Sequence, residues 1–345
     1  MNTPVYYFPK HKKRKITKYC RILSTASYIP ERIVSNDDII TVNGFSFKNN
    51  FILKSIGVEK RHVAADTQDD SDLLFEAARK CLDNYQLNPE NLTRIIVNKF
   101  MGDNLLPMTA SRLQSKLGSS VANHAFDIDG GISSFLVAMD LASRFVGTGD
   151  EYILIASGGI HNRLISKTDP RVAFLFGDAS AALLVGPAPE AHLLAGYFYS
   201  NHQFYELATM NGMEFFREIS WNGDESIFFD AYKLDNWKIA EEFYHRATRE
   251  IYQNLLDESG LSIQNIDLVL VAENNIRIRE IILDTIGVNE DKSISLLKDY
   301  GNTMSAMLPL LLDHGRRNGR IQPGMNIMLI SHGEGLSGGG IIYKV

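Results

Sequence analysis

Short, continuous apolar runs alternate with helical periodicity along the chain, and one such unit occurs twice. A helical pattern over residues 77–85 leads through the short polar segment 87–92 into the apolar run 95–97. A strand without a polar face belongs inside a parallel or mixed sheet that is covered on both sides. The second half repeats this order of helix, turn and strand over residues 248–256, 261–266 and 268–271.

The repeat continues beyond the first strand of each half. A loop at 126–131 leads into an apolar helix at 135–146 and then into a strand at 152–156 that ends in a glycine-rich turn. Helices that alternate with apolar strands predict an α/β fold, and a duplicated unit predicts two similar halves with any site at their junction. The counterparts in the second half are the loop 300–303, the helix 306–319 and the strand 326–330.

Between the halves the pattern breaks down. Residues 187–233 mix aromatic, amide and acidic side chains without a clear period, which predicts a connecting or cap segment. A poorly structured connection is the alternative. The predicted organisation is therefore an N-terminal half at 20–186, a connection at 187–233 and a C-terminal half at 234–345, preceded by a basic extension at 1–19.

Charge and composition narrow the function class. The chain has 345 residues, a net charge of −6 and a pI near 5.9, which argues against a nucleic-acid partner. The basic run 10–15 either attracts an acidic partner or membrane surface, or is a solvated terminus. No apolar stretch is long enough for a transmembrane helix, no signal peptide is recognised, and two cysteines suffice for neither a disulfide framework nor a metal cluster. A cytoplasmic protein that binds no metal and no membrane is expected.

Short motifs that follow one another along residues 20–345 resemble those of ketoacyl-ACP synthase III in the thiolase superfamily. The resemblance implies a thiolase-like α/β fold, in which duplicated βαβαβαββ halves form five layers, αβαβα. It also implies a dimer formed through the central sheet, with the Leu106-Pro107 loop of one subunit reaching the partner. The motifs lie at residues 26–31, 57–63, 106–107, 113–118, 176–182, 275–278, 300–303 and 333–340.

The resemblance also implies where the catalytic groups of the family would stand. The nucleophilic cysteine of the family lies at the start of the buried helix, where the helix end favours a thiolate. In this chain that position holds Ile132, and the position of the family histidine, three residues before Asn275, holds Ala272. The asparagine of the Tyr-Gly-Asn-Thr motif is retained as Asn302. Without the nucleophile and one hydrogen-bond donor, conventional condensation is not expected.

Four other side chains are candidates for substitute chemistry. Ser133 follows the cysteine position directly, and its alternative role is helix capping. Asp129 and Glu273 flank the two changed positions and are candidate acids or bases, or else a loop cap and an ion-pair partner. His332 in the last glycine-rich loop could activate Ser133, or could be structural.

The thioester-binding residues of the family are partly retained. An aromatic residue and an arginine hold the coenzyme A adenine in the family, and here Phe51 and Ser55 match them, with Lys54 beside the latter. A second family arginine, which meets the nucleotide phosphate, matches Arg163, and Asn275 of the Asn-Ile-Arg-Ile motif is carried over with this group. No permanently bound cofactor is expected, and coenzyme A or phosphopantetheine thioesters are candidate substrates.

Two functions follow from the resemblance. The chain is either a non-condensing partner subunit of an active homologue, or an acyltransferase that uses Ser133 or a carboxylate or histidine base. An acyl-chain-binding protein is a third interpretation. The expected partners are a second copy or a ketoacyl synthase-like sibling, and an acyl carrier protein.

Overall fold

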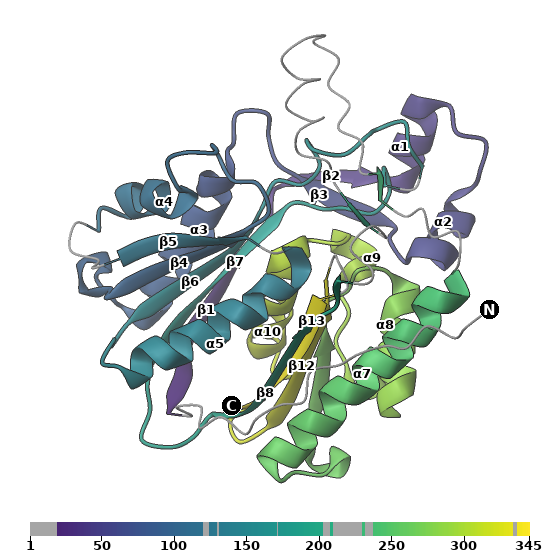
Figure 1. The fold of residues 1–345 in the computed structure, drawn as a ribbon. Coiled ribbons are helices and arrows are strands. Elements are labelled where there is room, and N and C mark those ends of the chain that lie inside the picture. The colour runs from purple at the N-terminus through teal and green to yellow at the C-terminus, as the bar shows by residue number, and fades with distance from the viewer. Residues whose placement is uncertain are drawn as a thin grey trace.

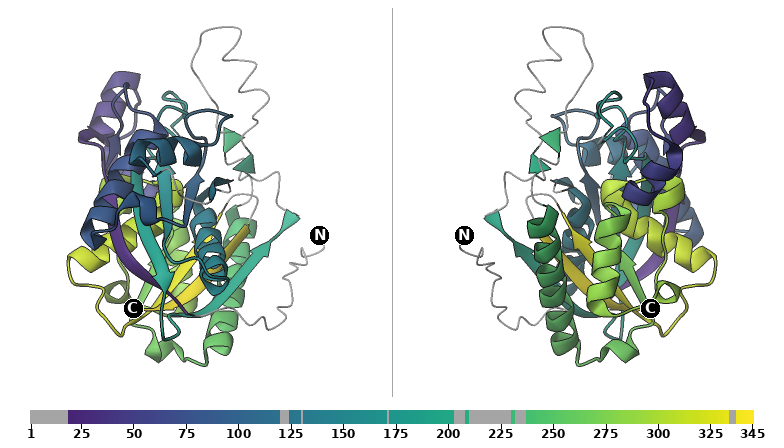
Figure 2. Two further views of the ribbon diagram at one scale, coloured as in Figure 1. Left: turned by 90° about the vertical axis from the view of Figure 1, so that its left-hand side faces the viewer. Right: turned by 90° about the vertical axis from the view of Figure 1, so that its right-hand side faces the viewer.

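Two sheets lie on either side of a central pair of helices, and further helices cover their outer faces (Figures 1 and 2). The computed structural model describes residues 19–119, 124–129, 131–170, 172–202, 208–209, 230–231, 237–333 and 337–345. The basic run 10–15 lies outside these residues.

The first sheet has five strands, and the second has four in the described part of the chain. Within the first sheet β4 is parallel to β5 and β6, whereas β7 is antiparallel to β6 and β1. In order across it, the strands are β1 (Cys20–Tyr28), β7 (Ala179–Pro187), β6 (Ile153–Gly159), β4 (Arg94–Lys99) and β5 (His124–Asp129). The second sheet is ordered β11 (Leu268–Val271), β12 (Asn326–His332), β13 (Ser337–Lys344) and β8 (Leu193–Ser200).

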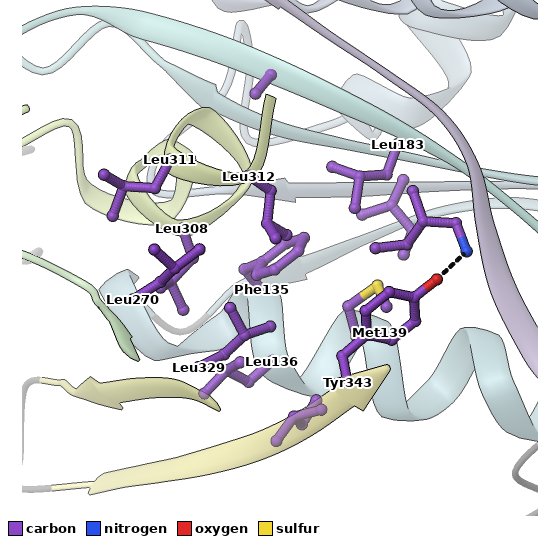
Figure 3. Close-up of a cluster of buried hydrophobic side chains, with 14 of the residues drawn as sticks. Phe135, Leu136, Met139, Leu183, Leu270, Leu308, Leu311, Leu312, Leu329 and Tyr343 are labelled. Atoms are coloured by element: carbon purple, nitrogen blue, oxygen red, sulfur yellow. Dashed lines mark hydrogen bonds between the residues drawn. The ribbon is translucent and has the colours of Figure 1, made fainter. Parts of the chain in front are cut away.

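Helices complete the five layers that the sequence predicts. Three apolar clusters fill the spaces between the layers, and the largest lies between the two sheets around α5 and α10 (Figure 3). Burial of one Leu, Ile or Phe side chain stabilises the fold by about 1.5–3 kcal/mol, so this central cluster is a main source of stability. The layers are formed by α3 (Asp70–Tyr85) and α4 (Thr109–Leu117), α5 (Ser134–Gly147) and α10 (Met307–Arg317), and α7 (Trp237–Ser259) and α8 (Ile276–Ile286).

Strand β4 illustrates why the apolar runs have no polar, solvent-exposed face. Ile96 belongs to the central cluster, whereas Ile95 and Val97 belong to the cluster under α3 and α4. Successive side chains of a strand point to opposite faces, so a strand covered on both sides has to be apolar throughout.

The two sheets correspond strand by strand, which agrees with the predicted duplication. β1, β7, β6 and β4 match β8, β13, β12 and β11 in position. The first loop predicted at 126–131 is wrong in part, because His124–Asp129 is the edge strand β5, held parallel to β4. Its counterpart in the second half is a single bridge between Val269 and Ser293.

The boundary between the halves lies earlier than the sequence predicts. Leu193–Ser200, inside the segment 187–233 assigned to the connection, is strand β8 of the second sheet. Most of the remaining connection lies outside the described residues, apart from the paired strands β9 (Ala208–Thr209) and β10 (Asp230–Ala231). No helix in the described part of the chain is both long and apolar enough to span a bilayer.

Smaller elements complete the described chain. The strand pair β2 (Arg32–Ser35) and β3 (Lys60–Val63) lies with α1 (Asn36–Asn43) and α2 (Asn49–Ile56) at one end of the molecule (Figure 1). The others are the helix α9 (Leu297–Tyr300) and the 3-10 turns η1 (Pro89–Asn91), η2 (Gly131–Ser133), η4 (Ile263–Asn265), η5 (Glu290–Lys292) and η6 (Met304–Ala306).

Candidate functional site

The two positions predicted to have lost the family's cysteine and histidine lie in one apolar cluster. Ile132 belongs to η2, directly before α5, and is 1% exposed. Ala272 follows β11 and is fully buried. Both side chains belong to the central cluster between the sheets, so the duplicated fold brings the two elements to one place. The side chains at both positions consist of hydrocarbon only.

The start of α5 is held by a hydrogen-bonded pair that the sequence reasoning missed. The Ser134 hydroxyl donates to the carbonyl of Gly131 at 2.5 Å and accepts a hydrogen bond from the Asn98 side-chain amide. The hydroxyl of Ser305 in η6 donates to the backbone carbonyl of Asn98 at 3.1 Å. Asn98 therefore ties the end of β4 to the starts of the two central helices. The signal in the sequence that could have predicted this role is the amide side chain of Asn98 directly after the apolar run 95–97.

Ser133 lies beside these residues but has no proton acceptor. Its side chain is 8% exposed, and no hydrogen bond of its hydroxyl involves another described residue. The backbone of Gly333 approaches it closely, since a Cβ atom added to Gly333 would lie 2.7 Å from Ser133 Oγ. A side chain at position 333 would require the Ser133 side chain to move, and the contact places the end of β12 beside the start of α5.

His332 is adjacent to Gly333 in sequence but faces away from Ser133. It lies on the face of β12 that packs under α7, where its Nδ1 lies 2.8 Å from the Tyr199 hydroxyl and its Nε2 lies 2.9 Å from the Thr248 hydroxyl. Burial lowers the pKa of His332 to about 3. The predicted alternative of a Ser133–His332 pair is not formed, because both ring nitrogens bond to other residues.

Glu273 is likewise turned to the outer layer. Its Oε1 lies 2.9 Å from Nε of the buried Arg279, and its Oε2 accepts the backbone N–H groups of Leu296 and Leu297 at 2.8 and 2.9 Å. Burial raises the pKa of the Glu273 carboxyl, against the opposing influence of these partners. The position agrees with the ion-pair alternative and leaves no path to Ser133.

Asp129 pairs with a lysine that the sequence reasoning also missed. Lys99, at the end of β4, is 6% exposed, and its ammonium lies 2.9 Å from Asp129 Oδ1 and 3.6 Å from Asp127 Oδ2. The Asp129 side chain itself is 69% exposed. Asp127 accepts the first two N–H groups of α4 at 2.9 and 2.7 Å. Lys99 therefore offsets part of the negative charge of the two aspartates at the end of β5.

Asn302 is the residue that sequence reasoning matched to the family's catalytic asparagine. It is 4% exposed, and its Oδ1 accepts the N–H of Met304 at 2.8 Å while its Nδ2 lies 3.4 Å from the carbonyl of Asn274. Several polar atoms nearby are buried without a hydrogen-bond partner in the described structure. They are Asn98 Oδ1, Ser157 Oγ, Asn274 Oδ1, Thr303 Oγ1 and Ser331 Oγ. These polar atoms thus belong to amide and hydroxyl groups.

The predicted thioester-binding residues have different surroundings. Phe51 and Lys54 lie on α2 and are exposed, Phe51 by 64%. Arg163 is exposed and donates to the carbonyl of Ala65 at 2.6 Å. Asn275 caps α8, because its side-chain oxygen accepts the N–H of Ile278 at 3.0 Å. Of these four residues, only Asn275 therefore has a structural role, the capping of α8, that fully explains its presence.

Known proteins resemble the chain over nearly its whole length, and two family models match parts of it. Residues 126–201 match the model of 3-oxoacyl-[acyl-carrier-protein (ACP)] synthase III, and residues 256–345 match its C-terminal model. The beta-ketoacyl-[acyl-carrier-protein] synthase III of Neisseria gonorrhoeae (strain NCCP11945) is 28% identical over 328 residues, which cover 95% of this chain and 99% of that protein.

Solved structures share the fold. The 3-oxoacyl-(acyl carrier protein) synthase III of Pseudomonas aeruginosa PAO1 superimposes with a TM-score of 0.83 at 23% identity, covering 94% of this chain and 98% of the other. The priming beta-ketosynthase of the R1128 polyketide biosynthetic pathway gives 0.85 at 22% identity, with 98% and 99% covered. These similarities establish the thiolase-like α/β fold, and with the sequence matches they support a relationship to the ketoacyl-ACP synthase III family.

Proposed function

We propose that this relative of the ketoacyl-ACP synthase III family is a non-condensing partner subunit of an active homologue in acyl or polyketide biosynthesis. One observation carries the proposal: Ile132 and Ala272, at the positions assigned to the nucleophile and the histidine, both belong to the central apolar cluster. Neither side chain has an atom that can hold an acyl group or donate a hydrogen bond. Neither side chain could therefore attack a thioester bound beside it.

The surface beside the site supports a partner. β5 is the outermost strand of its sheet in the described chain, so one edge of its backbone is available for pairing. Apolar side chains are exposed in the loop that leads to α4 and on α5, which contacts β5. They are Leu105 by 71%, Leu106 by 83%, Met108 by 41% and Val137 by 39%. Exposed apolar groups of this kind mark a protein interface.

The acyltransferase alternative depends on Ser133. A serine hydroxyl needs an adjacent base to attack a thioester, and His332 and Glu273 are both engaged in the outer layer. Asp129 is paired with Lys99. The partner-subunit function therefore accounts for more of the site than the acyltransferase does.

The first experiment measures covalent chemistry directly. The chain is incubated with acyl-coenzyme A and acyl-ACP thioesters, and its intact mass and the released thiol are measured, with Ser133→Ala as the control variant. We expect no mass gain and no thiol release. An acyl adduct that disappears in Ser133→Ala would replace the partner-subunit function with the acyltransferase.

The second experiment measures association. The chain is mixed with a condensing ketoacyl-ACP synthase III homologue from the same genome, and complex formation is followed by size-exclusion chromatography. We expect Leu106→Asp to abolish the complex. Val42→Asp is the matched control because Val42 is also 83% exposed but lies on α1. Equal association of both variants, or none with the unmodified chain, contradicts the proposal.

A further inference from the structure

A cavity lies at the opposite end of the strands from the candidate site. It has a volume of about 310 Å³, within the range of small-molecule pockets. Its walls are apolar and come from both halves of the chain: Ile22 on β1, Leu312 on α10, Ile327 on β12, and Ile321 in the loop between α10 and β12.

This cavity is separate from the residues discussed above. Ile327 lines it at the beginning of β12, whereas Gly333, which touches Ser133, follows the end of the same strand. Six residues of extended strand at about 3.3 Å each put the two places roughly 20 Å apart. A ligand in the cavity would therefore touch neither Ser133 nor Asn302.

Two arginines line the cavity, and neither has a protein partner. Arg21 is exposed on β1 and Arg316 is half-buried on α10, and the guanidinium group of neither forms a hydrogen bond or an ion pair with a described residue. The neighbouring arginines differ, since Arg317 pairs with Asp313 at 2.9 Å and Arg320 donates to the carbonyl of Asp291 at 2.6 Å. Arginine is suited to recognising carboxylates.

No acidic side chain is among the described residues that line the cavity. His192 lines it too, but its Nδ1 is engaged with the carbonyl of Lys344 at 2.8 Å. The oxygen of Val345 accepts the N–H of Gly324 at 2.8 Å. Among the lining side chains, the charged ones are therefore the two guanidinium groups.

A buried hydroxyl adds a further polar contact. Tyr343 is 4% exposed, and its oxygen accepts the N–H of Ile22 at 2.8 Å (Figure 3). Burial raises the pKa of Tyr343 to about 12, although the charges of Arg316 and Arg21 act in the opposite direction. The phenol is therefore protonated near neutral pH, and both arginines lie near enough to influence it.

We propose that this cavity binds a small amphipathic carboxylate, whose apolar body contacts Ile22, Leu312 and Ile327 and whose carboxylate contacts Arg21 and Arg316. The volume fits a body of about ten non-hydrogen atoms, if each takes roughly the 30 Å³ of a water molecule. A medium-chain fatty acid has this size and chemistry.

Calorimetric titration with octanoate, and with 1-octanol as its uncharged analogue, tests the proposal. We expect one saturable octanoate site and affinity for 1-octanol that is weaker by about tenfold or more, because the charged contact is missing. In Arg21→Gln/Arg316→Gln this preference disappears. Arg112→Gln, a cation on α4 outside the cavity, keeps it, and so does Arg316→Lys, which retains the charge.

Circular dichroism establishes that each variant is folded before titration. Octanoate binding that is unchanged in the double variant places the ligand elsewhere and overturns the proposal. Absence of saturable binding overturns it as well, and so does equal affinity for octanoate and octanol in the unmodified chain.

Discussion

The two faces of the second sheet differ in chemistry, although their residues alternate along the same strands. The inner face carries Ala272 and Ser331, whereas the outer face carries Glu273 and His332. Ala272 and Glu273 are neighbours in sequence and lie on opposite sides of the sheet, because strand side chains alternate. Glu273 and His332, which can carry a proton, therefore stabilise the outer layer and do not face the space between the sheets.

The largest expected effect tests the outer face. Replacing Glu273 by alanine removes the buried counter-charge of Arg279 and leaves it only the exposed Glu290, and we expect the free energy of unfolding to fall by about 3–5 kcal/mol in denaturant titration. Glu290→Ala is the matched control, because Glu290 pairs with the same arginine but its side chain is 69% exposed. We expect the control to cost less than about 1 kcal/mol. Similar losses in both variants would mean that the buried pair is not the main contact.

The next effect is a pH dependence from the same face. The pKa of His332 is about 3 in the folded chain and 6.5 as its ordinary value, so below pH 6.5 the unfolded chain binds a proton that the folded chain does not. This contribution to stability is lost as the pH falls, by about 2 kcal/mol between pH 7 and pH 5. The measurement is urea unfolding across this range, for the unmodified chain and for His332→Gln.

Because Asp70 also changes its protonation in this pH range, the unfolding curve of the unmodified chain has to be compared with that of His332→Gln. Burial raises the pKa of Asp70 to about 7, so protonation of Asp70 increases stability as the pH falls below 7 and opposes the effect of His332. Subtracting the His332→Gln curve removes this shared contribution. If the two curves are parallel, His332 is not a buried neutral ring.

The smallest effect distinguishes two adjacent serines. Ser134→Ala removes a hydroxyl that bonds Gly131 and Asn98, and we expect a loss of about 1–3 kcal/mol in the free energy of unfolding. Ser133→Ala removes a hydroxyl without a described partner, and we expect a change within about 0.5 kcal/mol. Thermal and denaturant unfolding of the two variants make the comparison. A larger loss for Ser133→Ala would reveal a contact of its hydroxyl.

Much of the fold could be predicted from the sequence because it is encoded in local patterns. The apolar run of β11 and the helix before it are continuous in sequence, and so are their counterparts β4 and α3. The edge strand β5 was predicted as a loop, because Asp127 and Asp129 interrupt its apolar pattern. Those aspartates are explained only by distant partners, the start of α4 and Lys99.

The candidate site could be predicted in position but not in detail. Ile132 and Ala272 do lie in one cluster, as the motif order implied. The orientation of Glu273 and His332 depended on the register of β11 and β12, and a shift of one residue exchanges the two faces. Sequence reasoning alone did not establish that register.

The separation of the two faces also bears on how such a chain arises by descent. Substitutions at Ile132 and Ala272 leave the Glu273–Arg279 pair and the hydrogen bonds of His332 in place, because those contacts lie on the other side of the sheet. Changes at these two positions therefore need not disturb the contacts of the outer layer during descent. By the same reasoning, a cysteine and a histidine can be introduced at these two positions in a framework that already folds.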